Sequence, residues 1–306
     1  MIMSFKIYFM PSRGMDNMSQ NELLERAKRQ TPGCSGVWKE MHGTPNIEEA
    51  DYYVILEATD QVTPDPDKTF YFSREPRGVG TGMGSMDPRI KRFSFLTGES
   101  YFSTFWYCER SGYTKTYDEL LNLSPQKKSR GMSCTLSEKT YLPGMNTRVQ
   151  FVRAFQEKHG DKFDLYGRIG RLSDLTDFVL EIEGDDKYNT LKDYRYCLAF
   201  DNGTYPNYFA TQFTDTLLSW TLPVYNVAPG ISNIHEFFPE GSYIPFDARN
   251  HNEVERIIKL LEEDKFEDHI PAMTEARKLI LDKYNLWNTI YEAITTGKNT
   301  WYANEG

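Results

Sequence analysis

The chain has 306 residues, of which 39% are hydrophobic and 14% aromatic, and its formal net charge at pH 7 is -9. The apolar content is sufficient to offset the conformational entropy lost on folding, which excludes a disordered protein, and the length allows two domains. The acidic balance argues against non-specific binding to nucleic acid, which depends on clustered Lys and Arg, whereas a pocket for one nucleotide needs only a few local cations.

The first half of the chain alternates short apolar runs with polar segments. Residues 5–10, 51–56 and 69–73 predict strands, and residues 21–30 predict a helix because their apolar side chains recur at helical spacing. Lys6 interrupts the N-terminal apolar run, which favours a strand over a signal peptide, and no stretch approaches the roughly 18 apolar residues of a membrane helix. We therefore expect a soluble, cytoplasmic protein without a membrane span.

A glycine-rich stretch follows the third of these strands, at residues 77–86, with glycines at positions 78, 80, 82 and 84. A dinucleotide-binding turn needs a strand directly before it and a helix directly after it. Here Pro76 precedes the stretch, and Asp87 and Pro88 follow it. We therefore interpret it as a surface loop beside a site.

The second half of the chain shows the same alternation more clearly. Strands are expected at residues 131–137, 163–166, 194–200 and 222–224, and helices at residues 146–159, 213–219, 253–262 and 273–294. The order of strand 194–200, helix 213–219 and strand 222–224 is typical of a parallel pair with a crossover helix.

These two α/β halves predict two Rossmann-like domains that face one another across a cleft. We place an N-terminal domain at residues 1–126, a second domain at residues 127–275, and a C-terminal helix within residues 276–306 that packs back on the first domain. In open parallel sheets, ligands bind outside the carboxyl ends of the strands. Residues at those ends are therefore the first candidates for a functional site.

Three short anchors in residues 194–225 carry a resemblance to a known family. They are Phe200-Asp201-Asn202 at the end of a strand, Thr211-Gln212 at the start of a helix, and Pro223-Val224-Tyr225 in the next strand. Their spacing resembles the donor-binding stretch of the α-1,3-fucosyltransferases, glycosyltransferase family ten. Residues 128–137, 144–149 and 164–168 agree in the same order, and residues 70–76 resemble the acceptor-domain segment with the family's catalytic glutamate.

The resemblance implies a GT-B fold and an inverting, metal-independent transfer of a sugar from a nucleotide-sugar donor to a glycan hydroxyl. The nucleotide-sugar is a co-substrate, and no bound cofactor is expected. GDP-fucose is the donor that the family implies. However, Thr211-Gln212 replaces a Glu-Lys pair that contacts the donor ribose and phosphate, and Asp201 replaces a glutamate. A UDP-sugar such as UDP-xylose fits this altered pocket as well.

Inverting transfer needs a base that takes the proton of the acceptor hydroxyl. Glu75 is the candidate, because it lies at a strand end before Pro76 and has Arg74 and Arg77 nearby. Asp60, beyond the strand at residues 51–56, is the reserve candidate. The alternative for Glu75 is a surface salt bridge.

The departing diphosphate needs cations or helix N–H groups, and Arg148, at the start of the helix at residues 146–159, is the leading choice. An ordinary solvated arginine is its alternative. Asp201 and Asn202 are expected either to bind ribose or sugar hydroxyls or to cap the turn at Asn202-Gly203. The full set of expected donor contacts is Arg130, Ser137, Arg148, Tyr166, Arg168, Asp201, Asn202, Tyr208, Thr211 and Gln212.

We expect no metal site. Asp65-Pro66-Asp67 imitates the D-x-D motif of metal-dependent glycosyltransferases, but it lies among prolines ahead of a strand and does not close an apolar strand. The five histidines show no ligand spacing, and the four cysteines form no C-x-x-C pair. A metal-dependent transferase that uses Asp65 and Asp67 stays as one alternative. The other is a catalytically silent carbohydrate- or nucleotide-binding protein, which the missing Glu-Lys pair suggests.

Overall fold

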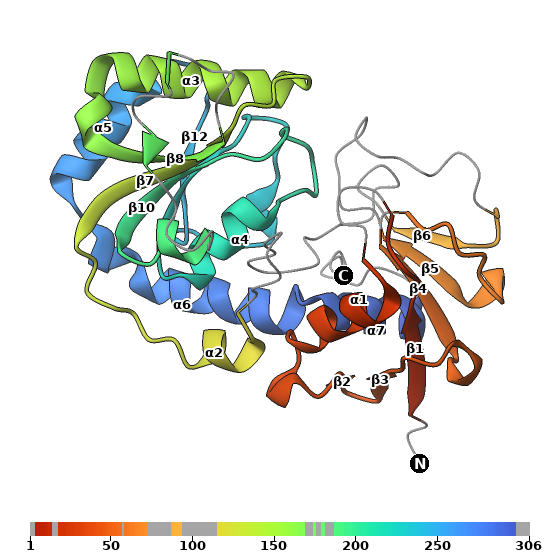
Figure 1. Ribbon diagram of the computed structural model, residues 1–306. Helices are drawn as coiled ribbons and strands as arrows, with labels where there is room; N and C mark the ends of the chain where they lie inside the picture. Colours follow the sequence, from red (N-terminus) through yellow and green to blue (C-terminus); the bar gives the residue numbers. More distant parts are fainter. Residues whose placement is uncertain are drawn as a thin grey trace. The chain divides into compact units, whose positions relative to one another are not determined.

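The computed structural model describes residues 4–13, 18–56, 58–72, 87–93, 115–168, 174–175, 179–180 and 187–297. The chain divides into two compact units, one formed by Met1–Asn122 with Leu281–Gly306 and the other by Leu123–Ile280. It therefore passes from one unit to the other twice. Within the described residues, each unit has its own six-stranded sheet (Figure 1).

The first unit contains a mostly parallel sheet with the strand order β2-β3-β1-β4-β5-β6, in which only the pair of β2 and β3 is antiparallel. Its strands are β1 (Phe5–Phe9), β2 (Val37–Trp38), β3 (Met41–Gly43), β4 (Tyr52–Leu56), β5 (Thr69–Phe72) and β6 (Lys91–Phe93). Its helices are α1 (Gln20–Lys28), α2 (Tyr117–Leu121) and α7 (Leu286–Thr296).

The core of the first unit forms around β1 and α7. Trp287 is fully buried, packs edge-on against Phe9 with 5.7 Å between ring centroids, and donates its indole N–H to the carbonyl of Ala27 at 2.7 Å. Helix α1 begins at a capping box, in which the side chains of Ser19 and Glu22 each accept from the other residue's backbone N–H. Helix α7, the last helix among the described residues, is thus part of the first unit.

The second unit is built on a sheet in which every strand pair is parallel, with the order β12-β11-β10-β7-β8-β9. Its strands are β7 (Arg130–Ser137), β8 (Phe163–Arg168), β9 (Val179–Leu180), β10 (Tyr194–Ala199), β11 (Leu222–Asn226) and β12 (Ile244–Phe246). Its helices are α3 (Pro143–His159), α4 (Thr211–Leu218), α5 (Glu253–Glu263) and α6 (Ile270–Lys278). Figure 1 shows α3 and α5 on one face of this sheet and α4 and α6 on the other.

The order of the strands in the second unit reverses beside β7. The chain adds β8 and β9 on one side of β7 and then β10, β11 and β12 on its other side. The reversal therefore lies between β7 and β10. Strand β8 fits closely beside β7 because Gly167 has a φ of 136°, and a Cβ there would lie 1.8 Å from the carbonyl oxygen of Leu136.

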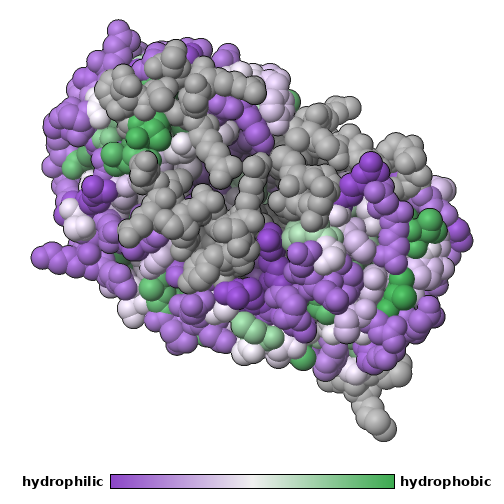
Figure 2. All heavy atoms as spheres, viewed as in Figure 1, coloured by the Kyte–Doolittle hydropathy of each residue, from purple (hydrophilic) through white to green (hydrophobic). Residues whose placement is uncertain are grey.

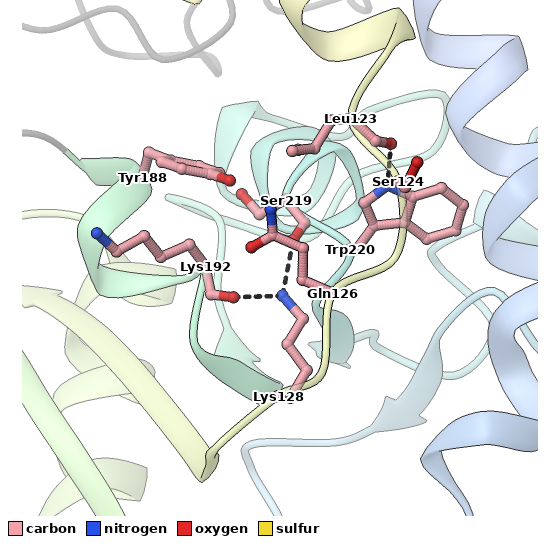
Figure 3. Close-up of a pocket in the computed structure, with 8 residues that line it drawn as sticks. All are labelled: Leu123, Ser124, Gln126, Lys128, Tyr188, Lys192, Ser219 and Trp220. Carbon is pink, nitrogen blue, oxygen red and sulfur yellow. Dashed lines mark hydrogen bonds between the residues drawn. The ribbon is translucent and has the colours of Figure 1, made fainter.

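Two buried basic residues, Lys128 and Arg277, hold the C-terminal end of α4, and Figure 3 shows Lys128 with its hydrogen-bond partners. The ammonium group of Lys128 donates to the carbonyls of Lys192 at 2.6 Å and Ser219 at 2.8 Å, and burial lowers the pKa of Lys128 to about 7. The guanidinium of Arg277 donates to the carbonyl of Leu217 at 3.2 Å and lies 4.3 Å from the ring centroid of Trp220. These hydrogen bonds hold the C-terminal end of α4 in place.

The predicted α/β class and the parallel arrangement of β10, α4 and β11 are confirmed. The single helix expected at residues 273–294 is wrong. Helix α6 is followed by a π-helical turn at Leu279–Lys283, and α7 begins only after Asn285. The buried side chain of Asn285 caps α7 and donates to the carbonyl of Gln30 at 2.9 Å, which holds the chain in an extended conformation at this point.

The other elements that the sequence did not predict are short. Strands β2, β3, β6, β9 and β12 have two or three residues each, and α2 has five, so their side chains show no clear period. On the face drawn in Figure 2, most described residues are hydrophilic and the apolar ones form small separate patches. No helix in the described part of the chain is both long and apolar enough to cross a membrane.

Candidate functional site

Three residues of the second unit meet where the strand order reverses. Ser137 ends β7, Asn202 follows β10, and Arg148 reaches both from α3. The guanidinium of Arg148 donates to the hydroxyl of Ser137 at 2.6 Å and to the side-chain carbonyl of Asn202 at 3.3 Å. Ligands of open parallel sheets bind at the carboxyl ends of the strands on either side of such a reversal. The geometry therefore assigns the candidate site to this position.

Arg148 is a buried cation, with only 8% of the residue exposed. Its two hydrogen-bond partners named above are neutral, and its Nε has no partner among the described residues. Burial lowers the pKa of Arg148, and the nearby Asp201 opposes this shift. A buried guanidinium without a paired carboxylate is costly, and an anionic ligand would compensate its charge.

Helix α3 begins earlier than the sequence suggested, at Pro143, so Arg148 lies in its second turn. The N-cap residue, Leu142, provides no side-chain hydrogen bond to the first backbone N–H groups. These N–H groups and the positive end of the helix dipole lie one turn before Arg148 on the same helix. Such a helix start is a general binding site for phosphate.

A close contact of Gly144 brings the start of α3 against the loop that follows β10. A Cβ at Gly144 would lie 2.6 Å from both the carbonyl oxygen of Asn202 and the Cα of Gly203. Only glycine allows this approach without moving the loop. Arg148 can reach Asn202 because the helix and the loop lie this close together.

We expect Gly144→Ala to push the loop away from α3 and to weaken binding of a nucleoside diphosphate about tenfold. Gly131→Ala is the matched control, because a Cβ at Gly131 would meet nothing within 4 Å. Isothermal titration of both variants with a nucleoside diphosphate checks the prediction. Equal affinities for the two variants would contradict the proposed contact.

Asp201 is the second buried charged group of the site, with 7% of the residue exposed. Its Oδ2 accepts from the hydroxyl of Tyr225 and from the backbone N–H of Ala210, the latter at 3.2 Å. Its Oδ1 is buried and has no partner among the described residues. Burial raises the pKa of Asp201 to about 7, and the hydrogen bond from Tyr225 opposes this shift. The carboxyl group can therefore accept a ligand hydroxyl and change its charge near neutral pH.

The other expected donor contacts in this region lie between β10 and the first turn of α4. Thr211 and Gln212 begin α4, and the amide nitrogen of Gln212 lies 4.0 Å from the sulfur of Cys197. Tyr208 is buried in the preceding loop, where its ring packs edge-on against Tyr205 at 5.9 Å. These residues follow Asp201 in the chain.

The structure does not bring Arg130 and Tyr166 to Arg148. Arg130 begins β7 and donates to the hydroxyl of Tyr166 at 3.1 Å, and it forms an ion pair with Asp164 at 3.2 Å. Tyr194, which begins β10, also receives a hydrogen bond from Arg130. Arg130 and Tyr194 begin their strands, and Tyr166, whose backbone pairs with Thr135 later in β7, reaches them through its hydroxyl. Arg130 is therefore at the opposite end of β7 from Ser137. A residue next to a strand in the sequence can therefore contribute to the site only when it lies at the carboxyl end of that strand.

For three further predicted residues, the structure describes no side-chain contact with Arg148. The backbone of Arg168 pairs with Ser137 at the end of β8, but its side chain is outside the described part of the chain. Glu75 also lies outside the described residues. Asp60 is in an exposed turn of the first unit, where it forms an ion pair with Arg13. Exposed pairs of this kind contribute about 0–1 kcal/mol to stability.

The carboxylates of Asp65 and Asp67 take part in local contacts. Asp65 caps a 3-10 turn by accepting the backbone N–H of Asp67 at 3.0 Å, and Asp67 forms an ion pair with Arg89 at 3.4 Å. Within the described residues, no group of three His, Cys, Asp or Glu side chains is arranged to hold a metal ion.

Two residues near the site were not assigned a role from the sequence. Tyr225 was part of the Pro-Val-Tyr anchor, and its position directly beside β10 could have suggested a contact with Asp201. Lys187 belongs to no motif. Its ammonium group lies 2.7 Å from the carboxylate of Asp215 and donates to the carbonyl of Thr211 at 3.3 Å.

Residues 125–269 match the family model described as "Glycosyltransferase family 10 (fucosyltransferase) C-term". These residues, slightly less than half of the chain, are similar to the C-terminal domain of that family. The resemblance seen in the sequence is thereby confirmed, and Ser137, Arg148, Asp201 and Asn202 all lie within the matched residues. No curated protein matches the chain.

Solved glycosyltransferase structures have a similar fold to this chain. It is similar to an alpha1,3-fucosyltransferase with GDP, at 17% identity over 99% of this chain and 92% of that chain, with a TM-score of 0.50. A structure of alpha1,3-fucosyltransferase with GDP-fucose is 14% identical over 90% of this chain and 82% of that chain, with a TM-score of 0.46. A glycosyltransferase of lipopolysaccharide biosynthesis is 11% identical over 96% and 100% of the two chains, with a TM-score of 0.43. The predicted GT-B fold class is confirmed.

Proposed function

We propose that this family 10 glycosyltransferase uses GDP-fucose as its donor and transfers fucose to a hydroxyl group of a glycan, with inversion and without a divalent cation. The observation that supports the donor site most directly is the buried Arg148 guanidinium between Ser137 and Asn202. The choice of nucleotide rests on the family match and on the similar structures that hold GDP and GDP-fucose.

The chemistry of sugar transfer explains why a cation is needed at this position. When the bond between fucose and the diphosphate breaks, the negative charge on GDP grows. Arg148 and the backbone N–H groups at the start of α3 are placed to stabilise that charge. In this proposal they perform the task that a divalent cation performs in metal-dependent transferases.

The other side of the donor site is suited to hydroxyl groups. The unpartnered Oδ1 of Asp201 is a strong acceptor for a ribose or fucose hydroxyl. Thr211 and Gln212 add neutral polar groups at the start of α4. Inversion additionally requires a base beside the acceptor hydroxyl, and Glu75 stays our prediction for that base.

Ligand-induced stabilisation tests the choice of donor. We expect GDP and GDP-fucose to raise the melting temperature, with about 2.7 kcal/mol of stabilisation at a ligand concentration of a hundred times Kd. UDP and UDP-xylose serve as matched controls and should give little shift. A larger shift with UDP-xylose than with GDP-fucose would overturn the proposed donor.

Product analysis tests the reaction itself. With GDP-fucose and a panel of glycan acceptors, we expect a fucosylated product whose anomeric configuration, read by NMR, is opposite to that of the donor. Activity should persist in EDTA. Donor binding with neither transfer nor slow donor hydrolysis would instead indicate a silent binding protein, and loss of activity in EDTA would contradict the metal-independent mechanism.

A further inference from the structure

Lys187 ties the segment before β10 to the start of α4. It begins the short 3-10 turn Lys187–Thr190, and its ammonium group donates to the Asp215 carboxylate at 2.7 Å and to the Thr211 carbonyl at 3.3 Å. The side chain of Asp215 is 1% exposed and that of Lys187 is 18% exposed. The pair is thus largely buried, where the desolvation cost is high and good geometry is required.

The same pair is connected to Asp201 through one peptide unit. Thr211, whose carbonyl accepts from Lys187, directly follows Ala210, whose N–H donates to Oδ2 of Asp201 at 3.2 Å. Holding Thr211 in place therefore holds the N–H group that orients the Asp201 carboxyl. Lys128 and Arg277 bond to the other end of α4, so their contacts do not replace that of Lys187 at its first turn.

Lys187 also acts on Asp201 through its charge. Burial raises the pKa of Asp201, while the hydrogen bonds from Tyr225 and Ala210 and the charges of Lys187 and Arg148 oppose that shift. The two cations belong to different elements, since Arg148 is on α3 and Lys187 precedes β10. On α4, Asp215 is the direct partner of Lys187.

We propose that Lys187 is a positioning residue of the donor site, which holds the first turn of α4 against Asp201 and supplies a second cation beside that carboxyl. This inference rests on the proposed function, because it requires that Asp201 contacts the donor. In the simpler alternative, Lys187 only balances the buried charge of Asp215. The two accounts differ in what happens when both members of the pair are removed.

Titration of the purified full chain with GDP from about pH 5 to pH 9 separates these accounts. We expect Lys187→Met to weaken GDP binding about tenfold and to move the midpoint of the pH dependence upward, because a cation beside Asp201 is lost. Lys187→Arg should restore both quantities to within about twofold. The double variant Lys187→Met with Asp215→Leu, which removes both charges of this ion pair, should keep the weak binding and the shifted midpoint.

Lys192→Met is the matched control, because it removes the same charge from the same segment, and only the backbone carbonyl of Lys192 is used by Lys128. It should bind GDP as the wild type does. A double variant with wild-type affinity and midpoint would show that Lys187 serves only Asp215 and would overturn the inference, as would wild-type behaviour of Lys187→Met. A wild-type chain that does not bind GDP would overturn the proposed function as well.

Discussion

Arg148→Ala should weaken GDP binding by about a hundredfold or more and remove most fucose transfer, while leaving the fold intact. The guanidinium is buried, and electrostatic contacts to phosphate are stronger in a site that excludes water. Loss of one buried partner of a charged pair costs about 2–5 kcal/mol, which corresponds to this range. Calorimetric titration with GDP and a transfer assay measure the two effects.

Two variants serve as controls for Arg148→Ala. Arg153→Ala removes the same charge from the same helix, but Arg153 pairs with Asp174 at 2.6 Å on the surface, so we expect GDP affinity to change by less than about twofold. Arg148→Lys keeps the charge but cannot bridge Ser137 and Asn202 with a planar fork, so it should be intermediate. Unchanged GDP affinity in Arg148→Ala would contradict the assignment of the donor site.

Asp201→Asn should have opposite effects on stability and on function. Burial raises the pKa of Asp201 to about 7, whereas an unfolded aspartate has a pKa of about 3.9. Between these values the folded chain binds more protons than the unfolded chain, so the contribution of Asp201 to stability is greatest below about pH 4 and is lost as the pH rises to about 7. The side chain of asparagine does not ionise, so the variant should not lose this stability as the pH rises.

The melting temperature of Asp201→Asn should therefore exceed that of the wild type by a few degrees at pH 8, with a smaller or no difference at pH 4. GDP-fucose affinity should fall about tenfold, because a neutral amide is a weaker acceptor for a donor hydroxyl than a carboxylate. Thermal melts at the two pH values and titration with the donor measure both effects. A variant that is less stable than the wild type at pH 8 would show that the carboxylate has a structural role.

Much of the second unit follows from local sequence patterns. The apolar runs at residues 194–200 and 222–224, with the helix between them, are sufficient to predict a parallel pair. Because both strands run in the same direction, the residues that follow them must lie at one edge of the sheet. This is why residues at the ends of strands, such as Ser137, Asp201 and Asn202, could be predicted as site candidates, although chain order does not show that β7 lies beside β10.

The remaining details depend on tertiary contacts. Arg130 flanks the same strand as Ser137, but it stands at the amino end, where Asp164 and Tyr166 hold it. The contacts of Lys187 form only when α4 packs beside it, and no local sequence motif identifies this residue. The helix break at Asn285 depends on the carbonyl of Gln30, which is far away in the sequence. None of these contacts has a periodic signal.

A crystal structure of the chain with GDP tests the central claim most directly. We expect the diphosphate at the start of α3, with at least one phosphate oxygen hydrogen-bonded to the guanidinium of Arg148 and a ribose hydroxyl near Oδ1 of Asp201. GDP bound elsewhere, with Arg148 still bonded only to Ser137 and Asn202, would contradict the account.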